Sequence, residues 1–321
     1  MRKGAFILIG ILAFAGAFAM GAASRTVLKP EGMKRYSVSW DNRIGTLKKD
    51  LSYGDCAAEK FDLYLPKDHA RPAYGLVIYL HAGGFTSGDK SGDMSMLSWL
   101  CAKGYVAAGI NYTLVTDQSR ASVLSQSEEI RKAVPEVVRA AGEEGYRIDR
   151  MAAAGGSAGH TLAMLYAYRD GADAPVPVVL TFGAVGPSSF YAEDWGIFGV
   201  GTDTEEQREH GAALFSAMCG RVITPDEIAD GSYLEKVKPI AASEWVGSHP
   251  VPTVVAYGTH DRLQPFSASK RLKEALEKNH ADFRYFELTH SGHGLQNDDR
   301  IYLKWMETVE EYLDKYMPVR R

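Results

Sequence analysis

The sequence predicts an α/β fold, with a mostly parallel central sheet and helices on both faces. Short apolar runs alternate with helical stretches between residues 75 and 182, and the alternation resumes at residue 253. Such alternation is typical of parallel strands that are joined by helices. The chain has 321 residues, of which 45% are hydrophobic, so we expect one large core.

Two kinds of pattern predict the strands. Residues 36–53 and 59–66 alternate polar and apolar side chains, as half-buried strands do. Among the later strands, the run at residues 75–81 is continuously apolar, which is typical of a strand buried on both faces, and residues 150–157 are expected to form another buried strand. These later strands are expected at residues 75–81, 106–114, 150–157, 176–182, 253–257 and 283–288.

Helical periodicity predicts the connections between these strands. The expected helices cover residues 94–100, 125–145, 158–168, 267–278 and 302–316. Ser125 and Glu128 have the spacing of a capping box and predict the start of the second helix. Pro135 has no amide hydrogen to donate, so it predicts a kink or a break in that helix.

The alternation stops between about residues 184 and 250. This segment is rich in glycine, aromatic and acidic residues, and Pro225 with the three residues after it is typical of a helix start. We therefore expect an insertion that forms a small cap or lid over the carboxyl edge of the sheet.

The first residues are typical of a signal peptide. Arg2 and Lys3 precede an apolar run over residues 5–20, and small residues crowd the end of that run. The run is shorter than the ~20 residues that span a bilayer comfortably. We expect residues 1–23 to be cleaved, which leaves residues 24–321 as an exported domain, secreted or associated with the cell envelope. The alternative is an uncleaved amino-terminal anchor.

The composition argues against several classes of partner. Charged residues make up 24% of the chain and the net charge is −4, with no basic block, so we expect no nucleic-acid partner. The chain has three cysteines, none at metal-ligand spacing, and we expect neither a metal nor another cofactor. Contact with a membrane is expected only through an uncleaved amino-terminal segment.

The strongest local motif is Gly155-Gly-Ser-Ala-Gly159. It follows an apolar strand and precedes a helical stretch, which is the context of a nucleophile elbow, a strained turn that exposes a serine. The helix that begins there directs its amide hydrogens toward the site and favours a developing oxyanion. Ser157 is therefore the predicted nucleophile. The alternative is a serine in an ordinary loop.

A second glycine-rich motif, His81-Ala-Gly-Gly-Phe85, follows the third predicted strand. Glycines at such a position let backbone amides turn toward a substrate. Gly83 and Gly84 are predicted to form one side of an oxyanion hole and the amide of Ala158 the other. The alternative is a simple turn. His81 is expected to shape the loop by hydrogen bonding.

A catalytic acid and base are expected after the nucleophile in the chain. Asp261 follows the strand predicted at residues 253–257, and His293 lies between two glycines after the last predicted strand. Parallel strands would bring both side chains to the carboxyl edge of the sheet. The competitors are Glu287 for the acid and His290 for the base, which are expected to reach the nucleophile less well. Asp298 is expected to cap the last helix.

These residue types suit the hydrolysis of an acyl bond. His293 would take the proton of Ser157 as the serine hydroxyl attacks an acyl carbon, and Asp261 would hold the imidazole in one tautomer. Water would then release the acyl group from the enzyme in the same way.

Six segments together resemble the carboxylesterases related to hormone-sensitive lipase, and especially their bacterial feruloyl and acetyl esterase-like branch (BD-FAE-like). They read FDLYLPKD, VIYLHAGGFTSGDKSG, INYTL, GGSAGHTLA, GTHDRLQP and SGHG, and they extend from Phe61 to Gly294. The resemblance implies an α/β-hydrolase fold, the same triad and the same oxyanion donors. It also implies action on short acyl esters, including acetyl or feruloyl groups on plant polysaccharides.

Two positions depart from the pattern of that family. Ala82 stands where the family has the first loop glycine, and His160 stands where a glycine often follows the elbow. Four aromatic residues are candidates for binding the substrate, namely Phe85, Tyr112, Trp195 and Phe198. For the last two, the alternative is that they pack the insertion onto the body of the domain.

Three functions are compatible with these motifs. The first is an exported serine carboxylesterase for short-chain or aromatic acyl esters, including esters of carbohydrates. The second is a serine peptidase of the same fold, in which Glu193, Asp194 and Asp203 would recognise a substrate amine. The third is a catalytically inactive binding module, which carries the least weight because all three predicted triad residues are present.

Overall fold

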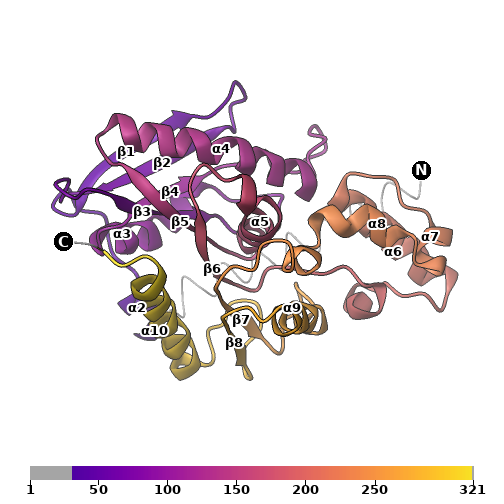
Figure 1. The fold of residues 1–321 in the computed structure, drawn as a ribbon. Helices are drawn as coiled ribbons and strands as arrows, with labels where there is room; N and C mark the ends of the chain where they lie inside the picture. Colours follow the sequence, from indigo (N-terminus) through magenta and orange to yellow (C-terminus); the bar gives the residue numbers. More distant parts are fainter. Residues whose placement is uncertain (1–30, 320–321) are drawn as a thin grey trace.

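The computed structural model describes residues 31–319, and the signal peptide predicted at residues 1–23 lies outside the described residues. Within the described residues, eight strands form one sheet in the order β1-β2-β4-β3-β5-β6-β7-β8 (Figure 1). β2 is antiparallel to β1 and β4, and all other neighbours are parallel. The strands are β1 (Gly45–Ser52), β2 (Lys60–Pro66), β3 (Tyr74–Leu80), β4 (Val106–Ile110), β5 (Ile148–Gly156), β6 (Val178–Ala184), β7 (Thr253–Gly258) and β8 (Phe283–Leu288). The predicted α/β class is confirmed.

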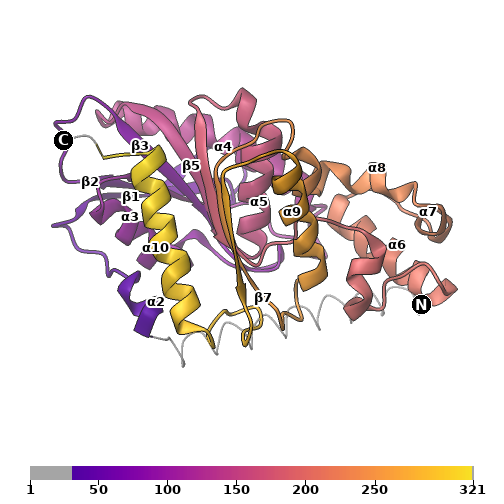
Figure 2. The same cartoon turned by 60° about the horizontal axis from the view of Figure 1, so that its bottom comes forward.

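Helices cover both faces of the sheet, as predicted. α3 and α10 lie on one face, and α4, α5 and α9 lie on the other (Figures 1 and 2). These helices are α3 (Met94–Ala102), α4 (Val123–Glu143), α5 (Ala158–Leu165), α9 (Phe266–Lys278) and α10 (Asp299–Tyr316). A short helix, α2 (Glu31–Arg35), packs against α10.

The central strands supply the core of the domain. Every residue of β4 and of β7 is buried, because helices cover these strands on both sides. The edge strand β1 has only one covered face, and most of its residues are exposed or half-buried. This difference explains why the central strands have continuously apolar sequences and the first strand an alternating one.

Two strands are shorter than predicted. β1 begins only at Gly45, because a turn precedes it in which the amide of Arg43 donates to Oδ1 of Asp41 (2.7 Å). β4 ends at Ile110 instead of residue 114, because the chain then leaves the sheet and Tyr112 and Val115 bond to the loop that follows β3.

The amino-terminal end of α4 differs from the prediction. Its capping box is formed by Ser122 and Ser125, each side chain accepting a hydrogen bond from the amide of the other, so the predicted Ser125–Glu128 box was wrong. Pro135 does not break the helix, which continues to its end eight residues later. Because Pro135 is exposed, water can reach the carbonyl oxygen that the proline leaves without a donor.

The insertion between β6 and β7 is fully described and contains helices without a strand. α6 (Glu205–Cys219) and α7 (Pro225–Asp230) begin with capping boxes at Thr204 and Thr224, and α8 (Tyr233–Val237) follows. The helix start predicted in this segment is confirmed. The three helices project beyond α5 and α9 at one end of the molecule (Figures 1 and 2).

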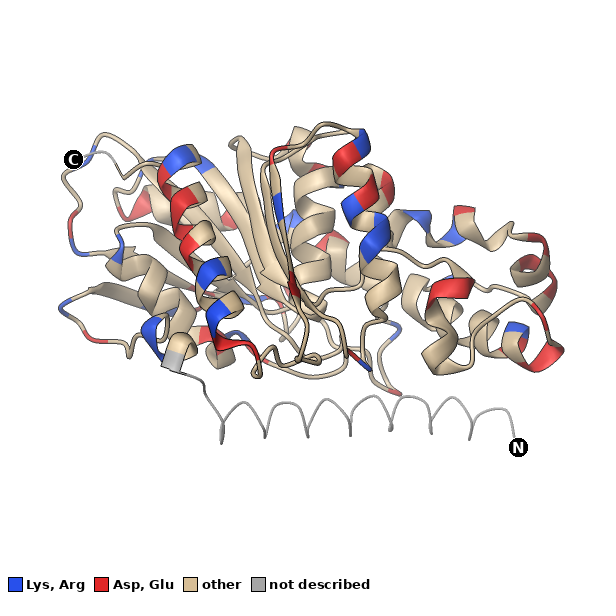
Figure 3. Ribbon diagram, turned by 90° about the horizontal axis from the view of Figure 1, so that it is seen from below, with Lys and Arg blue, Asp and Glu red and all other residues tan. Residues whose placement is uncertain are grey.

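The described part of the chain lacks several features that would indicate other functions. Between residues 31 and 319, no helix combines the length and the apolar character that a membrane span requires. These residues also contain no cluster of His, Cys, Asp and Glu side chains suited to a metal ion. Basic and acidic residues are interspersed over the helices (Figure 3). The three cysteines are unpaired, namely Cys56, Cys101 and Cys219.

Replacing Pro135 by alanine should raise the free energy of unfolding by about 2 kcal/mol. A proline inside a helix costs about 3 kcal/mol relative to alanine, and its restriction of the unfolded chain returns up to ~1 kcal/mol. The exposed Arg131 of the same helix provides the control, because Arg131→Ala should change the stability by less than about 0.5 kcal/mol. Urea unfolding measures both variants, and a Pro135→Ala protein no more stable than the wild type would contradict this reading of α4.

Candidate active site

Ser157 lies at a tight turn between β5 and α5. Its backbone has φ 52° and ψ −121°, a strained conformation for a residue with a side chain. The amide of Ser157 donates to the carbonyl oxygen of Ala184 at the end of β6 (2.9 Å). A side chain at Gly159 would collide with the carbonyl oxygen of Leu80 at the end of β3. The start of α5 therefore packs directly on β3, which only glycine permits at this position.

Ser157, His293 and Asp261 form a chain of hydrogen bonds. His293 Nε2 lies 2.8 Å from Ser157 Oγ, and His293 Nδ1 lies 2.7 Å from Asp261 Oδ2. The three residues follow β5, β8 and β7, whose carboxyl ends meet at one edge of the sheet because these strands are parallel. The structure thus brings together the three residues that the sequence indicated.

The surroundings of Asp261 determine the tautomer of the histidine. Asp261 Oδ1 accepts hydrogen bonds from the amides of Leu263 (2.8 Å) and Gln264 (3.0 Å), and the Asp261 side chain is only 1% exposed. The carboxylate oxygen Oδ2 accepts the proton of His293 Nδ1, which leaves Nε2 as an acceptor for the hydroxyl of Ser157.

Asp298 holds the loop that carries His293. Its carboxylate accepts hydrogen bonds from the amide of His290 (2.9 Å) and from the hydroxyl of Ser291 (2.7 Å). Burial alone would raise the pKa of Asp298, but the hydrogen bonds from Ser291 and His290 outweigh burial and keep the pKa below its usual value. Asp298 occupies the N-cap position of α10, as predicted, but its carboxylate bonds to this loop and makes no cap hydrogen bond to the helix.

The competing acid and base have other partners. Glu287 pairs with Lys270 of α9. His290 bonds to Asp298 through Nδ1 (2.8 Å), and 78% of its side chain is exposed. Neither residue takes part in the chain of hydrogen bonds that begins at Ser157.

Gly83 and Gly84 form the turn after β3. Their φ angles are 149° and 58°, and a side chain at Gly83 would collide with the carbonyl oxygen of Ser87. In the described part of the chain, the amides of Gly83, Gly84 and Ala158 have no acceptor. An oxyanion hole requires amides that have no acceptor in the resting protein, and these three amides meet that requirement. Their role stays a prediction.

Two predicted substrate-binding residues, Phe85 and Tyr112, belong to this loop and its support. Phe85 has a positive φ of 67°, and only 5% of it is exposed. Tyr112 is 1% exposed, donates its hydroxyl to the carbonyl oxygen of His81 (2.8 Å) and stacks on the His81 ring (4.2 Å between centroids). The structure therefore gives Tyr112 a supporting role in place of a substrate contact. His81 shapes the loop as expected, with Nδ1 2.9 Å from the carbonyl oxygen of Ala82.

The other two predicted substrate-binding residues, Trp195 and Phe198, belong to an aromatic cluster of the insertion. The Trp195 ring stacks on Phe190 (5.4 Å) and meets Phe215 of α6 edge-on (5.7 Å), and its Nε1 donates to the carbonyl oxygen of Ser189 (3.1 Å). Trp195 is 2% exposed, whereas Phe198 is half-buried. Packing accounts for Trp195, and Phe198 stays a predicted pocket residue.

His160, at one of the two unusual positions, is a core residue. It is fully buried, and its Nδ1 accepts a hydrogen bond from the amide of Gly186 (3.1 Å). Burial lowers the pKa of His160 to about 3, so the ring is neutral at physiological pH. This histidine therefore packs α5 against the loop after β6.

Substitution of the two loop histidines should separate their roles. Ser157→Ala and His293→Ala should each lower kcat by about 10⁴-fold or more, because the members of a triad act as a unit. His290→Ala should keep most of the activity, since its side chain is exposed and bonds only within its own loop. Steady-state kinetics on a short-chain ester measures all three variants. A larger loss of kcat for His290→Ala than for His293→Ala would show that His293 is not the base.

Substitutions in the aromatic cluster should distinguish packing from substrate contact. Trp195→Ala should lower the free energy of unfolding by about 3–5 kcal/mol, as expected for a buried tryptophan, with an unchanged preference among esters. Phe198→Ala should destabilise less and should shift the ratio of kcat/KM values for acetyl and longer esters. A Phe198→Ala protein with wild-type preference would show that the pocket lies elsewhere.

Comparisons with known proteins agree with this fold. Residues 61–185 match the BD-FAE family model. Kynurenine formamidase from Danio rerio is 34% identical over 92 residues, a match that covers 28% of this chain and only 29% of the formamidase.

Several solved esterase structures have the same architecture. Esterase B from Lactobacillus rhamnosis superposes with a TM-score of 0.67 at 17% identity, over 97% of this chain and 95% of that chain. A truncated carbohydrate esterase from gut microbiota has a TM-score of 0.64 at 16% identity, over 87% of this chain and 99% of that chain. Esterase Est2 from Thermogutta terrifontis has a TM-score of 0.64 at 17% identity, over 87% and 95%. The chain thus has the α/β-hydrolase fold, and its residues 61–185 match the BD-FAE family model.

Proposed function

We propose that this protein is a serine carboxylesterase that hydrolyses short-chain or aromatic acyl esters, including esters of carbohydrates. One observation carries the proposal. The strained Ser157 has its Oγ 2.8 Å from His293 Nε2, and His293 Nδ1 lies 2.7 Å from a buried carboxylate oxygen of Asp261. This geometry supports a serine that is activated by a histidine of fixed tautomer.

In the proposed acylation step, Ser157 Oγ attacks the acyl carbon while its proton moves to His293 Nε2. The carbonyl electrons move to the oxygen, which accepts hydrogen bonds from the amides of Gly83, Gly84 and Ala158. The bond to the alcohol oxygen then breaks, and His293 gives its proton to the leaving alcohol. Asp261 stabilises the charged imidazole throughout.

Deacylation repeats these transfers with water as the nucleophile. His293 takes a proton from water as the water oxygen attacks the acyl carbon, and it returns the proton to Ser157 Oγ as the acid leaves. Water replaces the alcohol, so the products are one acid and one alcohol, and the enzyme is restored.

The similar proteins support this chemistry and extend the range of substrates to test. Esterase B has also been solved with a tributyrin phosphonate inhibitor, and another similar structure is that of a carbohydrate esterase. These two similarities favour short acyl chains and sugar esters as substrates. The match to kynurenine formamidase adds the formamide bond as a second substrate class, because a serine nucleophile also attacks an amide carbonyl.

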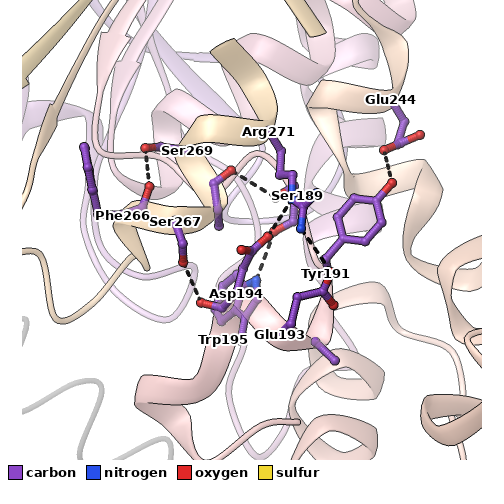
Figure 4. A network of polar contacts seen from close by, with 12 residues as sticks. Ser189, Tyr191, Glu193, Asp194, Trp195, Glu244, Phe266, Ser267, Ser269 and Arg271 are labelled. Carbon is purple, nitrogen blue, oxygen red and sulfur yellow. Dashed lines mark hydrogen bonds and ion pairs between the residues drawn. The ribbon is translucent and has the colours of Figure 1, made fainter. Parts of the chain in front are cut away.

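The peptidase alternative would need Glu193 and Asp194 to bind a substrate amine. Both carboxylates pair with Arg271 of α9, with Arg271 Nη2 3.0 Å from Glu193 Oε1 and Arg271 Nε 2.9 Å from Asp194 Oδ2 (Figure 4). The Arg271 guanidinium also stacks over the Tyr191 ring at 4.6 Å. A substrate amine would therefore have to displace this arginine from two of the three acidic residues predicted to recognise it, and the third, Asp203, is exposed. The pairing with Arg271 favours the esterase over the peptidase.

Export is part of the proposal and rests on the sequence of residues 1–23 alone. A carboxylesterase that acts on polysaccharide esters would meet its substrate outside the cell, and a signal peptide is consistent with that location. Amino-terminal sequencing of the protein recovered from the culture medium or cell envelope tests it. An amino terminus at residue 1 would favour the uncleaved anchor.

A serine-directed probe and a substrate panel test the proposed function. A fluorophosphonate should label the wild type and leave Ser157→Ala unlabelled, because the probe reacts only with an activated serine. Among acetyl, butyryl, octanoyl and feruloyl esters, acetylated xylan, an N-formyl amide and an aminoacyl amide, the highest kcat/KM should belong to a short-chain or aromatic ester. An aminoacyl amide as the best substrate would overturn the esterase in favour of the peptidase.

A further inference from the structure

The loop that carries Gly83 and Gly84 is attached at both ends to the segment after β4. At the start of the loop, Tyr112 Oη donates to the carbonyl oxygen of His81 (2.8 Å). At its end, the amide of Val115 donates to the carbonyl oxygen of Phe85 (2.9 Å). The two glycines therefore lie between two fixed points of the backbone.

Gln126, in the first turn of α4, makes a second bond at the Phe85 end. Its side chain is fully buried, and Nε2 donates to the carbonyl oxygens of Phe85 (2.9 Å) and Thr113 (2.8 Å). Because both neighbours are acceptors, only the amide NH₂ group can face them, which settles the orientation of the side chain. Gln126 thus joins the loop to the segment that supports it.

The other end of the Gln126 amide has no compensating bond. Within the described residues, Oε1 is buried without a hydrogen-bond donor. A buried acceptor without a donor destabilises the folded state, and an apolar residue would avoid this loss. A glutamine at this position is therefore better explained by its two donated hydrogen bonds than by packing.

The bond to Phe85 acts at a strained point of the loop. Phe85 has a φ of 67°, which is rare for a residue with a side chain, and it directly follows Gly84 with φ 58°. Such a conformation persists only where the surroundings hold it. Relaxation at Phe85 would turn the peptide plane that joins Gly84 to Phe85. The flexible backbone of Gly84 would then pass the change on to the Gly84 amide, which lies in the preceding peptide plane.

We infer that Gln126 is a positioning residue for the oxyanion hole, acting through the carbonyl oxygen of Phe85. The inference rests on the proposed function, because it assumes that the amides of Gly83 and Gly84 meet an oxyanion. Gln126 does not touch the reacting atoms. Its role is to keep the loop in the one conformation that directs these amides toward Ser157.

Gln126→Met tests the inference, because methionine preserves the length of the side chain and removes both donors. We expect kcat to fall by about tenfold, less than the ~10²–10³-fold loss of an oxyanion donor, with KM changed by less than about twofold. The inhibition constant of a trifluoromethyl ketone, which forms a tetrahedral adduct with the serine, should rise by the same factor as kcat falls, because the oxyanion is present only in the adduct and in the transition state.

Ser127→Ala is the matched control. Ser127 is the next residue of α4 and is equally buried, but its hydroxyl donates to Leu124 (2.6 Å) and accepts from Arg169 (3.0 Å), away from the loop. Any loss of stability in α4 should affect both variants, whereas the inhibition constant should change only in Gln126→Met. Equal kcat and inhibition constants in Gln126→Met and the wild type, or equal losses in both variants, would overturn the inference. A wild type that neither hydrolyses esters nor reacts with the ketone would instead refute the proposed function, and the inference with it.

Discussion

The site depends on the close contact between the end of β3 and the start of α5. Gly159 lies against the carbonyl oxygen of Leu80, where no side chain fits, and the amide of Ser157 is bound to Ala184 of β6. The elbow is thus held between its two neighbouring strands, which explains how Ser157 keeps a strained conformation. The same contact brings the start of α5, with the amide of Ala158, next to the loop that carries Gly83 and Gly84.

Asp261 and His293 are held in place by groups that take no part in the proposed reaction. Backbone amides after β7 fix one oxygen of Asp261, and the buried Asp298 fixes the loop that carries His293. Loops vary more easily than strands, so a loop that must hold a side chain within hydrogen-bonding distance needs anchors of this kind. The loop that carries Gly83 and Gly84 follows the same rule, with Tyr112 at one end and Gln126 at the other.

The insertion has a small core of its own. Trp195, Phe190 and Phe215 pack against one another, and Arg271 of α9 binds the acidic residues beside them. Of the candidates for substrate recognition, Trp195 is thus used in packing within the insertion, and Glu193 and Asp194 attach the insertion to α9. Phe85 and Phe198 stay predicted substrate contacts, because the structure gives neither of them the supporting or packing role that it gives Tyr112 and Trp195.

The sequence by itself determined the order of strands and helices, the position of the elbow at Ser157, and the choice of Asp261 and His293. These features depend on local backbone requirements and on the rule that parallel strands end at one edge, and both can be recognised along the chain. Only the tertiary structure decided that Tyr112 supports a loop and that Gln126 is bound to it. Their partners lie 31 and 41 residues away in the chain, and a hydrogen bond across such a distance leaves no periodicity or spacing in the sequence, because the fold alone brings the two groups together.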